Sequence, residues 1–246
     1  MKKKAILLVE LIAVLILIAL LLYSYIAYRG ESRYAVRPSN TRITIEHTGG
    51  LDFLQEEDVA RLLPFALQDS SLVAVNPAKV ESLLITNLTY AQEVNTYISP
   101  STNTLNIHLK SRTPILRYLQ GGRWYFLDSE GSPIVPRVGS SAYVPVAVGN
   151  ITDETVSTLL LPLAQYLKSN KKWHHFFGLI EIVSPRKIHL HPRVGDYIFE
   201  ITSVDNLDED LSKISIFYQK IVKQVGANKY RLVKLSYKDQ IVCKKR

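Results

Sequence analysis

The chain has 246 residues, a net charge of +8 and a single cysteine, Cys243. One cysteine excludes a disulfide framework within the chain, so the fold has to rest on the burial of apolar side chains. Residues 1–37 carry six Lys or Arg against two Glu, which is +4, and residues 38–246 carry the remaining +4. A nucleic-acid-binding face would need a denser basic patch, so the composition does not predict one.

Residues 5–28 form one long apolar run that directly follows three lysines at positions 2–4. As a helix, this run would reach roughly 36 Å, which is enough to cross about 30 Å of hydrocarbon. The lysines predict that the N-terminus stays in the cytoplasm. A cleaved secretion signal is the alternative, but its apolar core would be only about 7–15 residues long and would end in small residues. We therefore expect an uncleaved single membrane span, in which Glu10 reaches the headgroups or pairs with a lysine.

Residues 29–40 are polar, include Pro38 and predict a linker out of the membrane. The segment after it predicts the element order β-α-α-β-β, because alternating apolar residues mark strands and apolar residues three or four apart mark helices. Asn76 and Pro77 combine a helix N-cap with a first-turn proline. The expected elements are a strand at 42–46, a helix at 55–66, a helix that opens at 76–77, and strands at 90–98 and 104–109.

The remaining sequence, from residue 111 onward, predicts a strand-rich region with two amphipathic helices. Short apolar runs separated by turn residues mark the strands, and Gly226 marks the end of the last helix. The expected helices are 153–168 and 207–224, and the expected strands are 124–127, 134–135, 144–148, 179–183, 187–191, 197–201, 230–238 and 240–244. The fold class is therefore α+β, with a mixed β-sheet domain and two flanking helices after the first module.

The sequence contains no recognisable catalytic motif. It lacks a nucleophile elbow, an H-E-x-x-H zinc motif and a phosphate-binding glycine loop. Cys243 lies in a basic tail, where no walls would exclude water or hold a base. Asp128 and Glu130 lie on a tight turn, and we expect both carboxylates to point into water. We therefore predict that the protein is not an enzyme and has no cofactor.

The histidines and one acidic cluster are candidate metal ligands. His189 and His191 project from the same face of a predicted strand, and His174-His175 precede them in a loop. No carboxylate or thiolate stands at a matching spacing in the sequence, so we interpret all four as surface histidines and predict no metal site. The acidic residues at 205–210 lack the alternating spacing of a calcium loop and are interpreted as favourable charges at a helix N-terminus.

The last two predicted strands suggest a binding function. Val233, Leu235 and Tyr237 share one face of the predicted strand, and Lys234, Ser236 and Lys238 share the other. A half-buried strand near the end of a chain exposes backbone groups to a partner strand if it, or its neighbour, forms the sheet edge. The alternative is that the closing lysines and Arg246 protect the edge from pairing. The residues alone leave both interpretations open.

Several stretches of sequence occur together in a fixed order along nearly the whole chain. They are Asn103–Pro114, Trp124–Gly131, Val144–Gly149, Asn228–Tyr230 and Leu235–Val242. Together with a short basic N-terminus, a single span and the β-α-α-β-β module, this ordered set resembles the FtsQ/DivIB family of bacterial cell-division proteins. The β-α-α-β-β module is similar to a POTRA domain.

This resemblance implies a non-enzymatic scaffold of the divisome that links early and late division proteins and helps to control septal peptidoglycan synthesis. The POTRA-like module would recruit other divisome proteins. The C-terminal strand region would bind coiled-coil partners of the FtsB/DivIC and FtsL type, with strand addition as part of the contact. Carried over by position, the partner-binding residues are Tyr237, Lys238, Asp239, Gln240, Ile241 and Val242. Tyr237 would be the aromatic anchor. No nucleic acid, metal, cofactor or small-molecule substrate is implied.

The expected domains follow from the span and the resemblance. They are a cytoplasmic stub at 1–4, a transmembrane helix at 5–28, a linker at 29–40, a POTRA-like domain at 41–112, a partner-binding β domain at 113–242 and a basic tail at 243–246. We expect a single-pass protein of the inner membrane, with its bulk in the periplasm, at the division septum. The alternatives are a POTRA-bearing assembly factor, an anchored sensor or binding domain of the cell envelope, and a membrane-anchored cell-wall enzyme, for which no nucleophile or metal site is visible.

Overall fold

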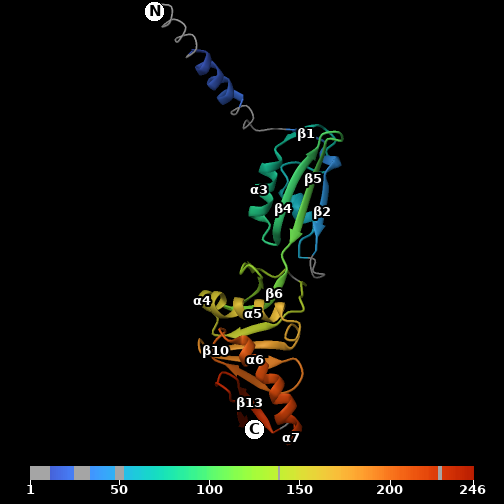
Figure 1. Cartoon of the computed structure of the whole chain (residues 1–246). Coiled ribbons are helices and arrows are strands. Elements are labelled where there is room, and N and C mark those ends of the chain that lie inside the picture. The colour runs from blue at the N-terminus through green and yellow to red at the C-terminus, as the bar shows by residue number, and fades with distance from the viewer. Residues whose placement is uncertain (1–11, 25–33, 48–52, 138, 227–228) are drawn as a thin grey trace, which may run out of the picture. The chain divides into compact units, whose positions relative to one another are not determined.

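The computed structural model describes residues 12–24, 34–47, 53–137, 139–226 and 229–246 (Figure 1). The chain divides into two compact units. Unit 1 comprises Met1–Glu46, Gln55–Leu88 and Glu93–Leu109, and unit 2 comprises His47–Leu54, Thr89–Gln92 and Lys110–Arg246. Each unit is described by itself below.

Residues 12–24 form a helix with exposed apolar side chains. Within the described residues, no helix combines the length and the apolar character that crossing a membrane requires. The span expected at 5–28 is therefore not found there. Residues 5–11, including Glu10, and residues 25–28 lie outside the described part of the chain.

Unit 1 is built around a three-stranded sheet in the order β2-β5-β4, with a separate antiparallel pair of β1 and β3. Its elements are β1 (Tyr34–Val36), a 3-10 turn (Pro38–Asn40), β2 (Arg42–Glu46), α2 (Glu56–Leu62), β3 (Val73–Val75), α3 (Pro77–Asn87), β4 (Ala91–Ser99) and β5 (Thr104–Ser111). The linker expected at 29–40 is wrong for residues 34–40. Val36 is fully buried there, and Ala35 pairs with Ala74 of β3.

Local signals set both helices of unit 1. Gln55 and Asp58 form a capping box at the start of α2, and the side chain of Asn76 accepts from the backbone N–H of Lys79 at the start of α3. The helix expected at 55–66 ends early, at Leu62. Leu63 adopts an extended backbone conformation because the ring of Pro64 disfavours a helical one at the preceding residue.

Unit 2 is a nine-stranded mixed sheet in the order β14-β13-β12-β11-β10-β9-β6-β7-β8. Its strands are β6 (Pro114–Gln120), β7 (Arg123–Asp128), β8 (Pro133–Ile134), β9 (Val146–Gly149), β10 (Phe177–Ser184), β11 (Lys187–Pro192), β12 (Ile198–Ile201), β13 (Tyr230–Lys234) and β14 (Val242–Lys245). Strand β9 is parallel to both β6 and β10, and β12 is parallel to β13; the other pairs are antiparallel.

Two helical stretches cover one face of this sheet (Figure 1). The first is α4 (Asp153–Thr155), a π-helical turn (Val156–Leu160) and α5 (Leu161–Ser169); the second is α6 (Leu207–Ile216), a π-helical turn (Phe217–Val222) and α7 (Lys223–Val225). Apolar side chains at alternate strand positions, such as Ile180, Leu190 and Phe199, pack against them in one core. The positions between, such as Glu181 and Glu200, lie on the other face, as the period of two requires.

The strands of unit 2 differ from expectation in two places. β6 was not expected; it pairs with β7 through a hairpin whose two turn glycines, Gly121 and Gly122, have φ of 56° and 76°. The strand expected at 230–238 ends at Lys234. Beyond that point Leu235 donates its N–H to the carbonyl of Glu200, and residues 237–239 turn back toward β14.

Asp128 does not point into water as expected. It is buried, and its carboxylate accepts from the backbone N–H groups of Glu130 (2.9 Å) and Ser132 (2.8 Å) and forms an ion pair with Arg112. It therefore closes the β7–β8 turn and ties this turn to the start of β6. Arg112 and Asp128 both belong to stretches that carried the family resemblance.

Candidate functional site

The candidate site is the outer edge of the nine-stranded sheet at β14. The strand order ends there, and within the described residues β13 is the strand that pairs with β14. The pairing is antiparallel, with Val242 opposite Lys234 and Cys243 opposite Val233. Val233 lies in the core, so Cys243 faces the helices and Val242 faces the other side of the sheet.

The six predicted partner-binding residues fall into two groups. Four form the turn between β13 and β14 and are exposed, with 49% of Tyr237 accessible: Tyr237, Lys238, Asp239 and Gln240. Val242 begins β14 and is 41% exposed. Ile241 lies between them and packs against the core. Five of the six side chains are therefore exposed to solvent.

The turn has a defined backbone conformation. Gln240 donates its N–H to the carbonyl of Tyr237 at 3.3 Å, and Asp239 has φ of 55°. Asp is one of the few residues other than Gly that tolerate this left-handed conformation. The turn therefore presents Tyr237 at a defined position beside the start of β14.

A buried lysine of α6 hydrogen-bonds to the backbone at the start of this turn. Lys213 is only 7% exposed, and its ammonium donates to the carbonyls of Leu235 (2.7 Å) and Tyr237 (3.0 Å). Its charge is balanced by Asp210 at 3.3 Å and Glu209 at 3.1 Å. These carbonyls would otherwise be available to a strand ladder, which explains why β13 stops early.

Ser236 completes the same network. Its hydroxyl donates to Asp210 at 2.7 Å and accepts from the backbone N–H of Thr202 at 3.0 Å. The acidic residues at the start of α6 were interpreted only as favourable charges for the helix. Asp210 is in fact buried and contacts both Lys213 and Ser236, so it helps to position the turn.

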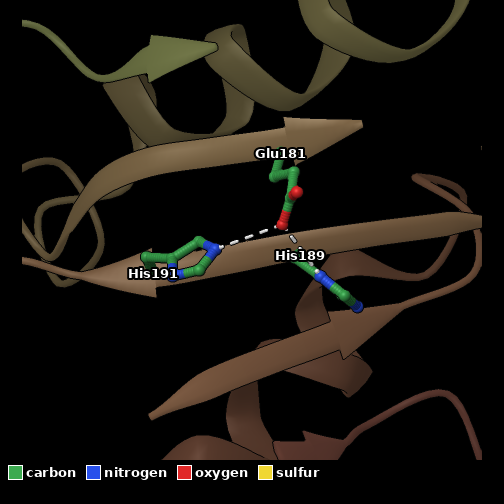
Figure 2. Close-up of side chains that lie close together, drawn as sticks. All are labelled: Glu181, His189 and His191. Carbon is green, nitrogen blue, oxygen red and sulfur yellow. Dashed lines mark hydrogen bonds and ion pairs between the residues drawn. The ribbon is translucent and has the colours of Figure 1, made fainter. Parts of the chain in front are cut away.

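A row of side chains crosses the face of the sheet opposite the two helical stretches; its first four members are polar or charged, and it ends at Val242. Cross-strand neighbours follow one another from β10 to β14: Glu181, His189, Glu200, Lys234 and Val242. His189 lies between the two carboxylates, with Nδ1 at 3.1 Å from Glu181 and Nε2 at 3.1 Å from Glu200. Figure 2 shows Glu181, His189 and His191 converging from β10 and β11.

The charges in this row favour one another. The ammonium of Lys234 lies 3.1 Å from the second oxygen of Glu200. Burial alone would raise the pKa of Glu200, but its hydrogen bonds with His189 and Lys234 outweigh this effect and lower that pKa below its ordinary value. The same contact with Glu200 raises the pKa of Lys234. Glu200 is therefore held as a carboxylate.

The four candidate histidines separate into two places. His189 and His191 lie on β11 beside Glu181, a carboxylate that the sequence interpretation missed because it lies on the neighbouring strand. His174 and His175 are exposed residues beyond α5, with their rings 4.1 Å apart, and line a separate cavity of about 420 Å³ together with Tyr143. The two pairs do not form a joint site.

Cys243 lies in β14 and not in a tail. It is half-buried, and burial raises the pKa of its thiol, the opposite of what an activated nucleophile needs. The basic tail expected at 243–246 is thus largely part of the edge strand.

The sequence profile of the family described as FtsQ/DivIB, C-terminal related, matches residues 113–244. This segment covers just over half of the chain and includes the nine-stranded sheet almost entirely. A comparison with curated proteins finds no match. On the strength of the family match, which runs from the start of β6 into the edge strand β14, the chain belongs to the FtsQ/DivIB C-terminal related family.

Proposed function

We propose that the protein is a membrane-anchored, non-enzymatic scaffold of the bacterial divisome, and that a strand of a partner protein adds to β14. Membership in the FtsQ/DivIB family, a non-enzymatic family of division proteins, suggests a role in cell division. The single observation that carries the finer proposal is the edge at β14, beyond which the described chain places no further strand.

Strand addition fits this edge physically. A partner strand gains affinity from backbone hydrogen bonds and specificity from side chains at alternate positions. Val242 is exposed at the start of the edge, and Tyr237 lies beside it as an aromatic anchor. Lys244 and Lys245 are exposed farther along β14. The basic edge favours a partner segment with acidic side chains and disfavours pairing with a second copy of itself.

The proposed partners are the periplasmic segments of FtsB/DivIC-like and FtsL-like coiled-coil proteins. The module at 41–112, proposed to be POTRA-like, would recruit other divisome proteins. The apolar run at 5–28 and the lysines before it support an anchor in the inner membrane with the N-terminus in the cytoplasm. In this arrangement the protein links early and late division proteins and helps to control septal peptidoglycan synthesis.

The decisive binding experiment compares two exposed valines at opposite ends of the same sheet. Val242→Asp places a charge on the β14 edge, and Val135→Asp places the same charge just after β8, where Val135 is 56% exposed. We expect Val242→Asp to weaken binding of the partner segment at least tenfold, measured by calorimetry with the full-length chain in detergent. Val135→Asp should bind as the parent does. Equal binding by both variants, with unchanged circular dichroism, would remove β14 as the docking edge.

The cellular role has its own test. A fluorescent protein fused to the N-terminus should form a ring at mid-cell before visible constriction. Uniform membrane fluorescence in dividing cells, with a fusion that replaces the native protein, would exclude the septal role and favour an assembly factor or an anchored sensor of the envelope.

A further inference from the structure

We propose that Glu181, His189 and His191 bind a divalent transition-metal ion, with Zn²⁺ as the best match, on the face of the nine-stranded sheet opposite its two helical stretches. The inference does not depend on the proposed function. Two imidazoles and one carboxylate form a donor set that suits Zn²⁺, which takes His nitrogen and Glu oxygen at about 2.0–2.2 Å. Among the described residues, these are the three His, Cys, Asp or Glu side chains whose ligand atoms lie close enough together to share one ion.

The geometry already approaches that of a bound ion. Figure 2 shows the three side chains pointing toward one another from two neighbouring strands, and their ligand atoms all lie within 4.8 Å of one another. Glu181 Oε2 is 3.1 Å from His189 Nδ1 and 3.7 Å from His191 Nε2. In a tetrahedral site with bonds of about 2.0–2.1 Å, ligand atoms lie roughly 3.3 Å apart. Small side-chain rotations would therefore suffice to enclose the ion.

His191 supplies an independent indication. Its Nε2 is shielded from solvent and has no hydrogen-bond partner in the described structure, since 3.7 Å to Glu181 is too long for one. A buried polar nitrogen without a partner is costly, so structures seldom contain one without a reason. A metal ion placed between His191 and Glu181 would use this lone pair.

The surroundings of His189 are those of a metal ligand with a supporting carboxylate. Ligating histidines commonly donate their second ring N–H to a carboxylate, which fixes the tautomer and the ring orientation. Here Nε2 of His189 faces Glu200 at 3.1 Å, and Glu200 is itself buried and paired with Lys234. With the Nε2 hydrogen donated to Glu200, the ion at Nδ1 replaces the hydrogen that otherwise bridges Nδ1 and Glu181. Glu200 is thus a positioning residue.

The charges also favour a cation at this point. Lys234 neutralises Glu200, whereas Glu181 contacts the two histidines. Three protein ligands leave a fourth position for water or for a donor from another molecule. The strands that carry the site, β10 and β11, belong to the row that continues through Glu200 and Lys234 to Val242.

The test uses the full-length chain without a histidine tag, purified in detergent and stripped of metal with a chelator. Titration with Zn²⁺ alone should show one equivalent bound, and the loaded protein should unfold at a higher temperature. Glu181→Gln and His191→Gln should each weaken Zn²⁺ binding at least tenfold. Glu200→Gln should weaken it by about 10- to 100-fold through loss of the supporting carboxylate. Substitution with Co²⁺ should give the visible absorption of a four-coordinate ion.

The matched control removes the other pair of histidines. The double variant His174→Ala/His175→Ala should keep the full stoichiometry and affinity. Because Glu181 is partly exposed, Glu181→Gln should fold normally, which circular dichroism of the metal-free protein checks. Absence of Zn²⁺ binding to the parent chain would overturn the proposal. So would binding that survives both Glu181→Gln and His191→Gln, or binding that disappears in the double variant.

Discussion

The two ends of the nine-stranded sheet differ in how well they are covered. At one end, β8 has only two residues, begins with a proline, and buries Ile134 against Phe53 and Phe126. At the other end, β14 has four residues, three of them exposed. Proline and short length both protect an edge from further pairing. The contrast supports the proposal that a partner strand docks at β14 and not at β8.

The β8 end depends on an aromatic cluster. Phe53 stacks on Tyr90 with ring centroids 6.0 Å apart and meets Phe126 at 5.3 Å. The hydroxyl of Tyr90 donates to the carbonyl of Val135 just beyond β8, at 2.8 Å. Side chains distant in sequence thus cover the last strand of the sheet. The described structure shows no comparable cover over β14.

The largest effect is expected from Phe53→Ala, which removes this cover. Truncating a fully buried phenylalanine costs about 3–5 kcal/mol. The free energy of unfolding of unit 2 should fall by that amount in urea titrations of the full chain. Partner binding at β14 should persist under conditions where the variant is folded. Loss of binding in the folded variant would show that the two edges are not independent.

Lys213→Met should have the next largest effect, because it breaks the buried network behind the β13–β14 turn. Removing one member of a buried ion pair costs about 3 kcal/mol, since Asp210 keeps an uncompensated charge. The carbonyls of Leu235 and Tyr237 also lose their donor. Unlike Phe53→Ala, this variant should lose partner binding while still folded, as calorimetry at low temperature would reveal.

Lys172→Met is the matched control for that experiment. Lys172 is exposed and contacts Ser215 of α6, on the same helix that supplies Lys213. It should change stability by less than about 0.5 kcal/mol and leave binding intact. Weakened binding in this control would mean that α6 as a whole, and not the Lys213 network, sets the turn.

Lysine substitutions at the neighbouring positions 241 and 242 test which side chain near the β14 edge faces the core and which is exposed. Ile241→Lys forces a charge toward the core and should cost about 1–3 kcal/mol in the free energy of unfolding. Val242→Lys adds a charge to an exposed side chain and should change stability by less than about 0.5 kcal/mol. Both should weaken partner binding. Equal losses of stability in the two variants would contradict the assignment of Ile241 to the core face and of Val242 to the opposite face of the sheet.

Much of unit 2 could be predicted from sequence periodicity. The two helical stretches and the strands β10, β11 and β12 lie within two residues of their expected positions, because long amphipathic helices and buried apolar strands leave regular patterns. β6 was missed although the Gly121-Gly122 pair is a hairpin signal. Its first residues are buried on both faces, so they show no alternation.

Less of the candidate site than of the fold could be predicted from the sequence. The family resemblance placed the proposed partner-binding residues in the terminal strand region, but the sequence could not show that Ile241 faces the core, because the irregular turn at 237–240 resets the alternation. The Glu181–His189–Glu200 row was missed for a different reason. Its members come from three strands, and only the sheet order brings them together.

The smallest effect concerns the helices that cover the two halves of the sheet. Tyr166 of α5 donates to Asp208 at the start of α6 at 2.6 Å, and burial together with this hydrogen bond raises the pKa of Tyr166 to about 12. The folded pKa lies above the unfolded value of about 10, so the unfolded chain ionises first. The stabilisation from Tyr166 is therefore fully present below pH 10 and is lost as the pH rises through about 12.

Tyr166→Phe isolates this contribution, because the variant lacks the hydroxyl and keeps the ring. At neutral pH it should unfold with a free energy lower by about 0.5–1 kcal/mol, the net worth of one partly exposed hydrogen bond. The difference between parent and variant should shrink between pH 10 and pH 12, although Tyr218, whose pKa is also raised to about 12, destabilises both proteins alike in that range. A difference that stays constant across this range would show that folding does not raise the pKa of Tyr166. No difference at neutral pH would show that the Tyr166–Asp208 hydrogen bond adds nothing to the apolar packing between the two helices.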